Sequence, residues 1–352
     1  MIGQNLNNLS TMNSPLVSIV VPCYNVERFL PRTIDILLNQ DYKQFEVYLI
    51  DDASTDNTKQ ICENICGRDA RFTLFSTNHV GPAKARNVVL NRLCGKYVWF
   101  LDADDIPSLC FLSKMVLKAE LTNADVTFCN YTISSSDEFV EGGVMHDADD
   151  VTKEEFLSSA FSLNRETGRC ANGGFLWNKL IKRNTMVELS IPDLKASEDE
   201  AFLFLLSRKL NNISFVGQPL YQYRIREGQI TSKSRFVTEF INTRYLITKE
   251  AKDFLERKIA NAAFFQALLI SVSATLRRSD FDEDTILFLK KHLSKMANLM
   301  TVVHDDIIDP KYRKYKKIIL LHKVPMVAFR LYYLLQIPRV ARFVREKVKN
   351  HE

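Results

Sequence analysis

The sequence of 352 residues contains little glycine or proline, with 11 and 10 residues of each. Collagen-like and low-complexity chains depend on these residues, so both classes are excluded. The chain also lacks an uninterrupted apolar run of about 18 residues, the length that predicts a membrane-spanning helix. Its first 16 residues have neither a basic start nor an apolar segment, so we expect no signal peptide.

Cysteine is present, but not in a pattern typical of a metal site or a disulfide framework. The seven cysteines are odd in number, all lie in the first half of the chain and form no pair of CxxC sequences. Cys62 and Cys66 are neighbours on an expected helix, where we interpret them as small apolar residues. A reducing, cytoplasmic compartment is the default that follows.

The net charge of +5 is unevenly distributed. Residues 311–352 contain twelve lysines and arginines against two glutamates, a balance of +10, so residues 1–310 carry −5. Basic and apolar residues alternate at helical spacing over 311–349, which suits a helix lying on an anionic membrane surface. The alternative is a solvated basic face whose apolar side packs on the body of the protein. A nucleic-acid partner is not expected.

The first half of the chain alternates between short apolar runs and stretches with helical spacing. The expected strands are 17–25, 45–50, 71–75, 97–101 and 125–131. Such alternation predicts an α/β fold with a mostly parallel, doubly wound sheet.

The second half is predicted to be mainly helical. We expect helices at 152–161, 175–182 and 198–209, a strand at 213–216, and then only helices, at 236–255, 257–277 and 283–300. This shift in pattern divides the chain into a loosely held lead-in at 1–14, a domain at 15–233 and a C-terminal α-helical extension at 234–352.

Two of the expected strands end in acidic residues. Asp51 and Asp52 follow one strand, and Asp102, Asp104 and Asp105 follow another. Carboxylates at the carboxyl ends of parallel strands face the ligand crevice of such a fold, and burying them unpaired is costly. We therefore expect the second cluster to hold a divalent cation that in turn holds a phosphate. The alternatives are a solvated acidic loop and, for the first pair, capping of the next helix.

Three segments, VSIVVPCYN at 17–25, IDDASTDNT at 50–58 and YVWFLDADD at 97–105, resemble in order and spacing the nucleotide-sugar half of family 2 glycosyltransferases, which have the GT-A fold (a Rossmann-like sheet). The resemblance covers residues 17–231. The segments FLWNKLIKR, SEDEAF and LYQYRIREGQIT are similar to bacterial members that build capsular, exopolysaccharide or lipopolysaccharide chains.

The resemblance implies an inverting transferase that moves one sugar from a nucleotide-diphosphate sugar to a hydroxyl of a glycan or lipid-linked glycan. Processive synthases of this family carry a QxxRW sequence, which this chain lacks, so transfer of a single sugar is favoured. The implied location is cytoplasmic and peripheral on the inner face of the bacterial plasma membrane. The alternative is a non-catalytic subunit that only binds nucleotide-sugar within a polysaccharide assembly complex.

The resemblance also assigns roles to individual residues. It puts the donor nucleotide against Pro22, Tyr24 and Asn25. It implies that Asp52, with Asp51, contacts the base. Asp102, Ala103 and Asp104 form its DxD motif, which contacts ribose and holds Mg²⁺ or Mn²⁺. Asp199, in the pair with Glu198, corresponds to its catalytic base.

Glu198 and Asp199 also have a structural interpretation. Ser197 and Glu200 have the spacing of a capping box, which places both acids in the first turn of a helix whether or not they catalyse anything. As a base, Asp199 would be held ionised by the helix end.

Several further residues are candidates with an open alternative. Lys84 and Arg86 could reach the diphosphate or line a solvated helix face, and Arg224 and Arg226 could contact the leaving group. Trp177, Asn178 and Lys179 could form an acceptor platform, with Trp177 in the core as the alternative. His79 and His146 are interpreted as solvated loop residues.

Overall fold

The computed structural model describes residues 14–163, 173–225 and 234–277. These residues divide into two compact units. The first comprises 14–160 with 173–225, and the second comprises 161–163 with 234–277. The expected helix at 283–300 and the basic tail lie outside the described residues.

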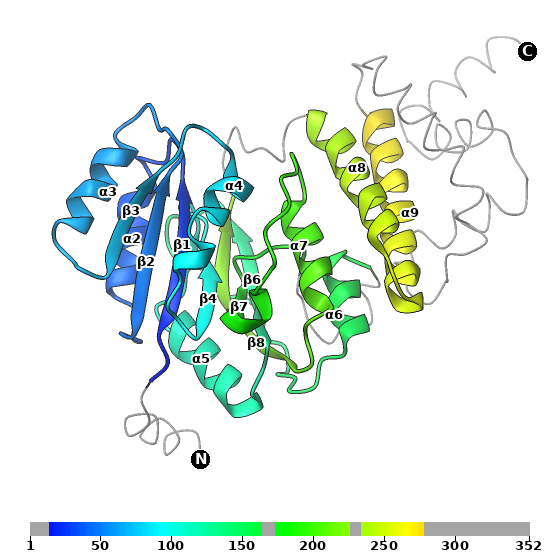
Figure 1. Ribbon diagram of the computed structural model, residues 1–352, viewed down its shortest axis with the longest axis horizontal. Helices are drawn as coiled ribbons and strands as arrows, with labels where there is room; N and C mark the ends of the chain where they lie inside the picture. The colour runs from blue at the N-terminus through cyan, green and yellow to red at the C-terminus, as the bar shows by residue number, and fades with distance from the viewer. Residues whose placement is uncertain (1–13, 164–172, 226–233, 278–352) are drawn as a thin grey trace, which may run out of the picture. The chain divides into compact units, whose positions relative to one another are not determined.

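The first unit is built on one mixed sheet of eight strands in the order β3-β2-β1-β4-β7-β6-β8-β5. β1 pairs in parallel with β2 and β4, and β2 pairs in parallel with β3, so these four strands run side by side (Figure 1). β7 is antiparallel to both β4 and β6, and β6 is parallel to β8. The strands are β1 Val17–Cys23, β2 Phe45–Asp51, β3 Phe72–Ser76, β4 Tyr97–Phe100, β5 Ile106–Pro107, β6 Val126–Ser134, β7 Lys179–Lys182 and β8 Ile213–Arg224.

Helices connect these strands as the alternating pattern predicts. Pro82 opens α4 at a position where a missing N–H costs no helical hydrogen bond. Asn123 ends α5 in the left-handed conformation, with φ of 47°. The helices of this unit are α2 Leu30–Leu38, α3 Thr58–Cys66, α4 Pro82–Asn87, α5 Phe111–Thr122, α6 Lys153–Ala160 and α7 Glu198–Ser207, with short 3₁₀ turns η1 Leu90–Arg92 and η2 Arg183–Met186.

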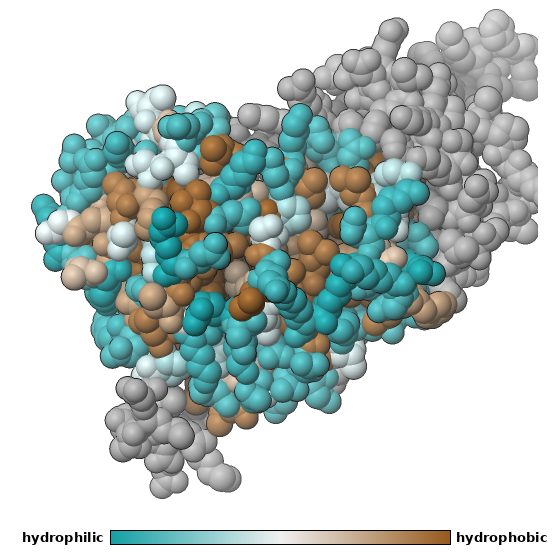
Figure 2. Space-filling view, in the orientation of Figure 1, coloured by the Kyte–Doolittle hydropathy of each residue, from teal (hydrophilic) through white to brown (hydrophobic). Residues whose placement is uncertain are grey.

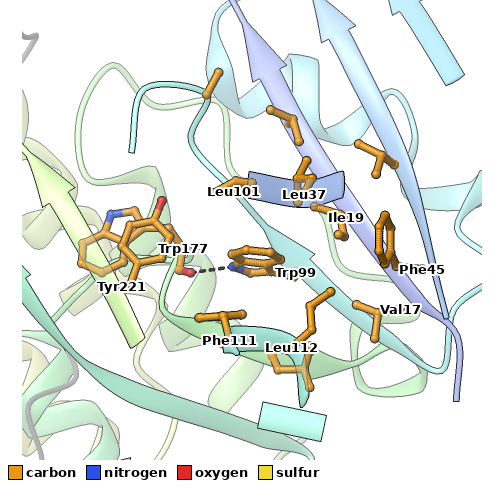
Figure 3. Packing of buried hydrophobic residues seen from close by; sticks show 14 of the residues in the cluster. Val17, Ile19, Leu37, Phe45, Trp99, Leu101, Phe111, Leu112, Trp177 and Tyr221 are labelled. Carbon is orange, nitrogen blue, oxygen red and sulfur yellow. Dashed lines mark hydrogen bonds between the residues drawn. The ribbon is translucent and has the colours of Figure 1, made fainter. Parts of the chain in front are cut away.

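The core of the first unit is centred on Trp99 of β4. Its ring stacks on Phe111 with the centroids 4.1 Å apart, and its Nε1 donates to the carbonyl of Trp177 at 2.7 Å (Figure 3). An indole N–H buried without an acceptor would cost about 1–3 kcal/mol. This bond therefore fixes the Trp177 segment against the central strand.

One predicted element is wrong, and another is a strand as predicted but longer. The helix expected at 175–182 is instead a turn followed by β7, which lies between β4 and β6. The apolar residues Leu176, Trp177, Leu180 and Ile181 fit a helical period, but the antiparallel pairing buries both faces of this short strand. The strand expected at 213–216 continues to Arg224, because β8 pairs with β6 along its length.

The second unit contains two helices, α8 Ser234–Glu250 and α9 Phe254–Arg277. Arg244 is buried, and its guanidinium donates to the carbonyls of Ala263 and Phe161 at 3.1 and 3.2 Å. It also lies over the Phe240 ring. This arginine therefore joins both helices to residue 161.

The described part of the chain has no helix suited to span a membrane, and its surface in one view mixes apolar and polar residues. Within residues 14–163, 173–225 and 234–277, we found no helix with the length and apolarity to span a bilayer. Figure 2 shows hydrophobic residues interspersed with hydrophilic ones, which is ordinary for a protein surface.

Candidate active site

The carboxyl ends of β1 and β4 mark the switch point of the sheet. After β1 the chain continues to β2 and β3 on one side, and it returns to β4 on the other. Ligands of open α/β sheets bind outside the carboxyl ends of the strands at such a point. The loop after β4 is fixed there, because the buried hydroxyl of Thr33 donates to the carbonyl of Ala103 at 2.7 Å. This bond holds Ala103 inward, between Asp102 and Asp104.

Arg86 of α4 connects the loop after β4 with the start of α7. Its Nη2 donates to Oδ1 of Asp102 at 2.7 Å. Its Nη1 lies 3.5 Å from Oε1 of Glu198 and 3.7 Å from Oδ1 of Asp199. The Arg86 side chain is only 5% exposed. The guanidinium is therefore surrounded by carboxylates, rather than lying on a solvated helix face.

Burial and charge together set the protonation of this cluster. Desolvation raises the pKa of Asp102 to about 6, against the opposing effect of Arg86. Desolvation likewise raises the pKa of Asp199 to about 6, again opposed by Arg86. For Arg86 itself burial lowers the pKa, but the attraction of Asp199, Asp102 and Glu198 outweighs it, so the guanidinium stays charged.

The two oxygens of Asp199 differ in their hydrogen bonds. Oδ2 accepts from the backbone amide of Leu176 at 3.2 Å. Oδ1 is buried and accepts no hydrogen bond. A carboxylate that is held by one oxygen, and whose other oxygen accepts no hydrogen bond, is suited to receiving a proton. The capping box predicted here does not form, because Ser197 adopts the left-handed conformation and makes no side-chain cap.

Asp105 does not belong to the acidic cluster, contrary to the expectation that all three acids after β4 hold a cation. Its carboxylate is buried and accepts from the Tyr221 hydroxyl and the Arg224 backbone amide, each at 2.9 Å. Burial raises its pKa well above the usual range. Asp105 therefore ties the loop to β8.

Asp52 organises the loop after β3. Its Oδ1 accepts from the Thr77 hydroxyl at 2.5 Å and the Val80 amide at 2.7 Å, and its Oδ2 accepts from the Gly81 amide at 2.8 Å. Burial raises the pKa of Asp52, but these three donors hold it below its usual range. Asp52 is therefore an ionised anchor for residues 77–81.

The other residues assigned to the donor nucleotide line the ends of β1 and β2. Pro22 lies within β1, and Tyr24 follows it with 43% of its surface exposed. Asn25 accepts from the Thr55 amide at 2.8 Å through its side-chain oxygen. Asp51 is buried and accepts from the Ser54 amide at 3.3 Å. Asn25 and Asp51 thus shape the turn between β2 and α3.

The remaining basic candidates make other contacts. Lys84 is exposed and pairs with Asp193 at 2.8 Å. Arg224 is buried, pairs with Asp137 and lies over the Phe29 ring at 5.1 Å. Arg226 lies outside the described residues.

The acceptor platform expected at 177–179 does not form, and the alternative that Trp177 lies in the core is confirmed. Trp177 is 2% exposed, and its ring stacks on Tyr221 at 4.4 Å (Figure 3) and on Phe175 at 4.7 Å, so it offers no face to a sugar. Asn178 is buried and donates to the Cys129 carbonyl. Lys179 is buried and donates to the carbonyls of Gly173 and Phe175.

Sequence reasoning missed Phe175, the outer member of this aromatic stack. It is 37% exposed, and the next residue in the chain donates its amide to Asp199. The sequence signal for Phe175 is its spacing of two residues from Trp177. In the structure, the turn that precedes β7 stacks these two rings.

A preformed metal cage is not found among the residues that the structure describes, where no group of three or more His, Cys, Asp or Glu has the required geometry. Magnesium-type sites with nucleotides commonly use only one or two carboxylates and take their other ligands from phosphate and water. Asp102 and Asp104, which flank the fixed Ala103, supply such a pair of hard oxygen donors. The residues present therefore fit a divalent cation that binds together with a nucleotide.

The eight-stranded mixed sheet with its acids at the carboxyl edge defines a GT-A type domain. The chain belongs to the glycosyl transferase family 2. The sequence model of this family matches residues 18–179, and the relative described next supports the assignment. A glycosyltransferase of Haemophilus influenzae is 32% identical over 222 residues, which span 63% of this chain and 84% of that protein. The glycosyltransferase EpsJ of Bacillus subtilis is 28% identical, and the match spans 62% of this chain but only 63% of EpsJ.

Solved structures support the same fold. The TarS fragment of Staphylococcus aureus in complex with UDP-GlcNAc has a TM-score of 0.61 at 22% identity, over 82% of this chain and 83% of that one. The mannosyltransferase PcManGT of Pyrobaculum calidifontis, in complex with GDP-Man and Mn²⁺, has a TM-score of 0.52 at 16% identity, over 87% and 84%.

Proposed function

We propose that the protein is an inverting glycosyltransferase that moves one sugar from a nucleotide-diphosphate sugar to a hydroxyl of a glycan. The observation that carries the proposal is the Arg86 cluster, which joins Asp102 of the DxD sequence to Asp199. A transferase needs its donor site and its base close together, and a charged, buried guanidinium holds these two elements in one place.

Asp199 is the proposed base. Its Oδ1, which accepts no hydrogen bond in the structure, accepts the proton of the acceptor hydroxyl while the amide of Leu176 holds Oδ2. The hydroxyl oxygen then attacks the anomeric carbon from the side opposite the diphosphate, and the bond to the diphosphate breaks. One displacement of this kind inverts the configuration at the anomeric carbon.

Asp102 and Asp104 are the proposed ligands of Mg²⁺ or Mn²⁺. When bound, such an ion neutralises negative charge on the diphosphate leaving group. Tyr24 and Asp52 are proposed to face the base of the donor. Arg86 serves as a positioning residue between the acids, because its guanidinium is already paired with Asp102.

The acceptor is proposed to be a glycan or lipid-linked glycan used in bacterial surface polysaccharide synthesis, on the cytoplasmic side of the membrane. The alternation of basic and apolar residues over 311–349 supports peripheral contact with an anionic membrane. Exposed Phe175, beside the proposed base, is suited to contact a sugar ring of the acceptor.

Turnover of a panel of nucleotide-sugars tests the proposal. We expect Asp199→Asn to lower kcat by at least about 100-fold, since general-base catalysis contributes 10²–10⁴-fold. Asp35→Asn is the matched control, because Asp35 is an exposed residue of α2 that pairs with Arg32. If Asp199→Asn keeps the full rate on the true donor, Asp199 is not the base. If the wild-type protein binds nucleotide-sugar but never turns it over, it is a binding subunit.

A further inference from the structure

Lys179, the first residue of β7, has a side chain with no exposed surface, and the proposed reaction gives it no task. Lysine is almost never fully buried unless it is paired. Its Nζ donates to the side-chain oxygen of Asn178 at 2.8 Å and to the carbonyls of Gly173, at 3.2 Å, and Phe175. An ammonium group donates hydrogen bonds and accepts none. These three oxygens therefore suit the charged form of Lys179.

Asn178 anchors this ammonium group to the sheet. Its side-chain nitrogen donates to the carbonyl of Cys129 in β6 at 2.9 Å, and its own backbone carbonyl accepts from the Cys129 amide at 3.0 Å. Asn178 is fully buried as well. Residues of the sheet thus fix the position of the ammonium group, and the turn before β7 binds to it.

This turn lies directly against the start of α7. Gly173 has a φ of +60°, in the left-handed region that glycine adopts without strain. A Cβ on Gly174 would lie 2.8 Å from the carbonyl oxygen of Ala160 and would overlap the side chain of Glu200 in α7. The two glycines therefore let the backbone of the turn approach the helix that carries Asp199.

Lys179 and Asp199 bind the two ends of one peptide group. The carbonyl of Phe175 and the amide of Leu176 belong to the same planar unit. The carbonyl accepts from Nζ of Lys179, and the amide donates to Oδ2 of Asp199 at 3.2 Å. Because this unit is rigid, the ammonium group that orients its carbonyl also orients its N–H toward Asp199.

We propose that Lys179 is a positioning residue for Asp199 and acts through the peptide group between Phe175 and Leu176. The inference rests on the proposed function and adds to it a residue that does not touch the substrate. It replaces the role in an acceptor platform that the sequence suggested for Lys179. A cation at the carbonyl polarises the peptide group, which strengthens its N–H as a donor to the carboxylate.

The charges around Asp199 agree with this arrangement. Burial raises the pKa of Asp199 to about 6, and the charges of Arg86 and Lys179 oppose that rise. Arg86 also pairs with Asp102, whereas Lys179 acts from β7 through the turn. The proposed base is therefore held by two cations that reach it by different routes.

A double-mutant cycle with Asp199 tests the inference. We measure the turnover of whichever UDP-, GDP- or dTDP-sugar reacts fastest. Lys179→Met should lower kcat at least about tenfold, because a small displacement of a catalytic group is costly, and leave the KM for the donor unchanged. In the Asp199→Asn background the same substitution should change kcat by less than about twofold, since its effect passes through Asp199.

Two results would overturn the inference. One is an unchanged kcat in Lys179→Met. The other is an equal loss in both backgrounds, which a general disturbance of the fold would cause. Lys182→Met is the matched control, because Lys182 lies on the same strand and donates to Asn123 at 3.1 Å, away from the turn. It should keep kcat within about twofold in both backgrounds.

A second variant keeps the cycle usable if Lys179→Met does not fold. Lys179→Gln keeps two N–H donors and removes the charge, and the same pattern of losses is expected for it in the two backgrounds. The outcomes also separate this inference from the proposed function. If Asp199→Asn loses its rate and the Lys179 variants do not, only the inference fails. If Asp199→Asn keeps the full rate, the assignment of the base fails and the inference with it.

Discussion

Nη2 of Arg86 lies 2.7 Å from Oδ1 of Asp102, inside a cluster of carboxylates from two other parts of the chain. The sequence separates these residues by 16 positions and places α7 about a hundred positions further on. The fold brings them together because α4 and the loop after β4 both lie at the carboxyl edge. One guanidinium therefore links the donor motif with the proposed base.

Replacement of Arg86 by methionine should destabilise the protein strongly at neutral pH. Removing one partner of a buried charged network leaves the carboxylates uncompensated, which costs about 3–5 kcal/mol. Urea unfolding gives the free energy. Lys84→Met, at an exposed pair on the same helix, should change stability by less than about 1 kcal/mol. Equal losses for the two variants would argue against a central role for Arg86.

The pH dependence of turnover should report the ionisation of Asp199. A base acts in its ionised form, and desolvation raises the pKa of Asp199 to about 6. The value of kcat/KM should therefore fall as the pH drops below about 6 and level off above it. Asp199→Asn should lose this acidic limb, whereas Asp35→Asn should keep it. An unchanged limb in Asp199→Asn would assign the ionisation to another group.

Removal of divalent metal should abolish turnover reversibly. Treatment with EDTA is expected to stop sugar transfer, and Mn²⁺ or Mg²⁺ should restore it. Asp104→Asn should raise the metal concentration needed for half-maximal activity, because one hard oxygen ligand carries less charge. Full activity in EDTA would show that Asp102 and Asp104 do not work through a cation.

Substitutions of Trp177 and Phe175 should have different effects, the first on the free energy of unfolding and the second on binding of the acceptor. Trp177→Ala removes a ring that is almost fully buried, and the loss should be about 3–5 kcal/mol in urea unfolding. Phe175→Ala removes a ring that is 37% exposed and should cost less than about 2 kcal/mol. In steady-state kinetics it should raise the KM for the acceptor and leave the KM for the donor unchanged. A raised donor KM would contradict the proposed acceptor contact.

Local patterns were enough to predict much of the sheet. The runs at Val17–Cys23, Phe45–Asp51 and Tyr97–Phe100 are β-branched and aromatic, and each is a strand. The prediction failed at Lys179–Lys182, whose four residues are too few for periodicity to distinguish a strand from a helix. There the neighbouring strands β4 and β6 decide the structure.

Residue types likewise indicated which side chains could carry chemistry, but not how each is used. Asp102 and Asp105 are alike in sequence, yet one faces Arg86 and the other is bound by β8. Trp177 is enclosed by rings, which is the core alternative that the sequence left open, whereas His79 is an exposed loop residue, as expected, whose ring contacts Tyr24.

The sequence by itself determined the kind of fold and the supply of carboxylates at strand ends, because strand propensity and hydrophobic pattern are local properties of the chain. Only the tertiary structure decided which carboxylates share Arg86, which carboxylate oxygens accept hydrogen bonds and which rings are covered. Those features depend on pairing between distant segments and on burial, and both arise only when the sheet has assembled.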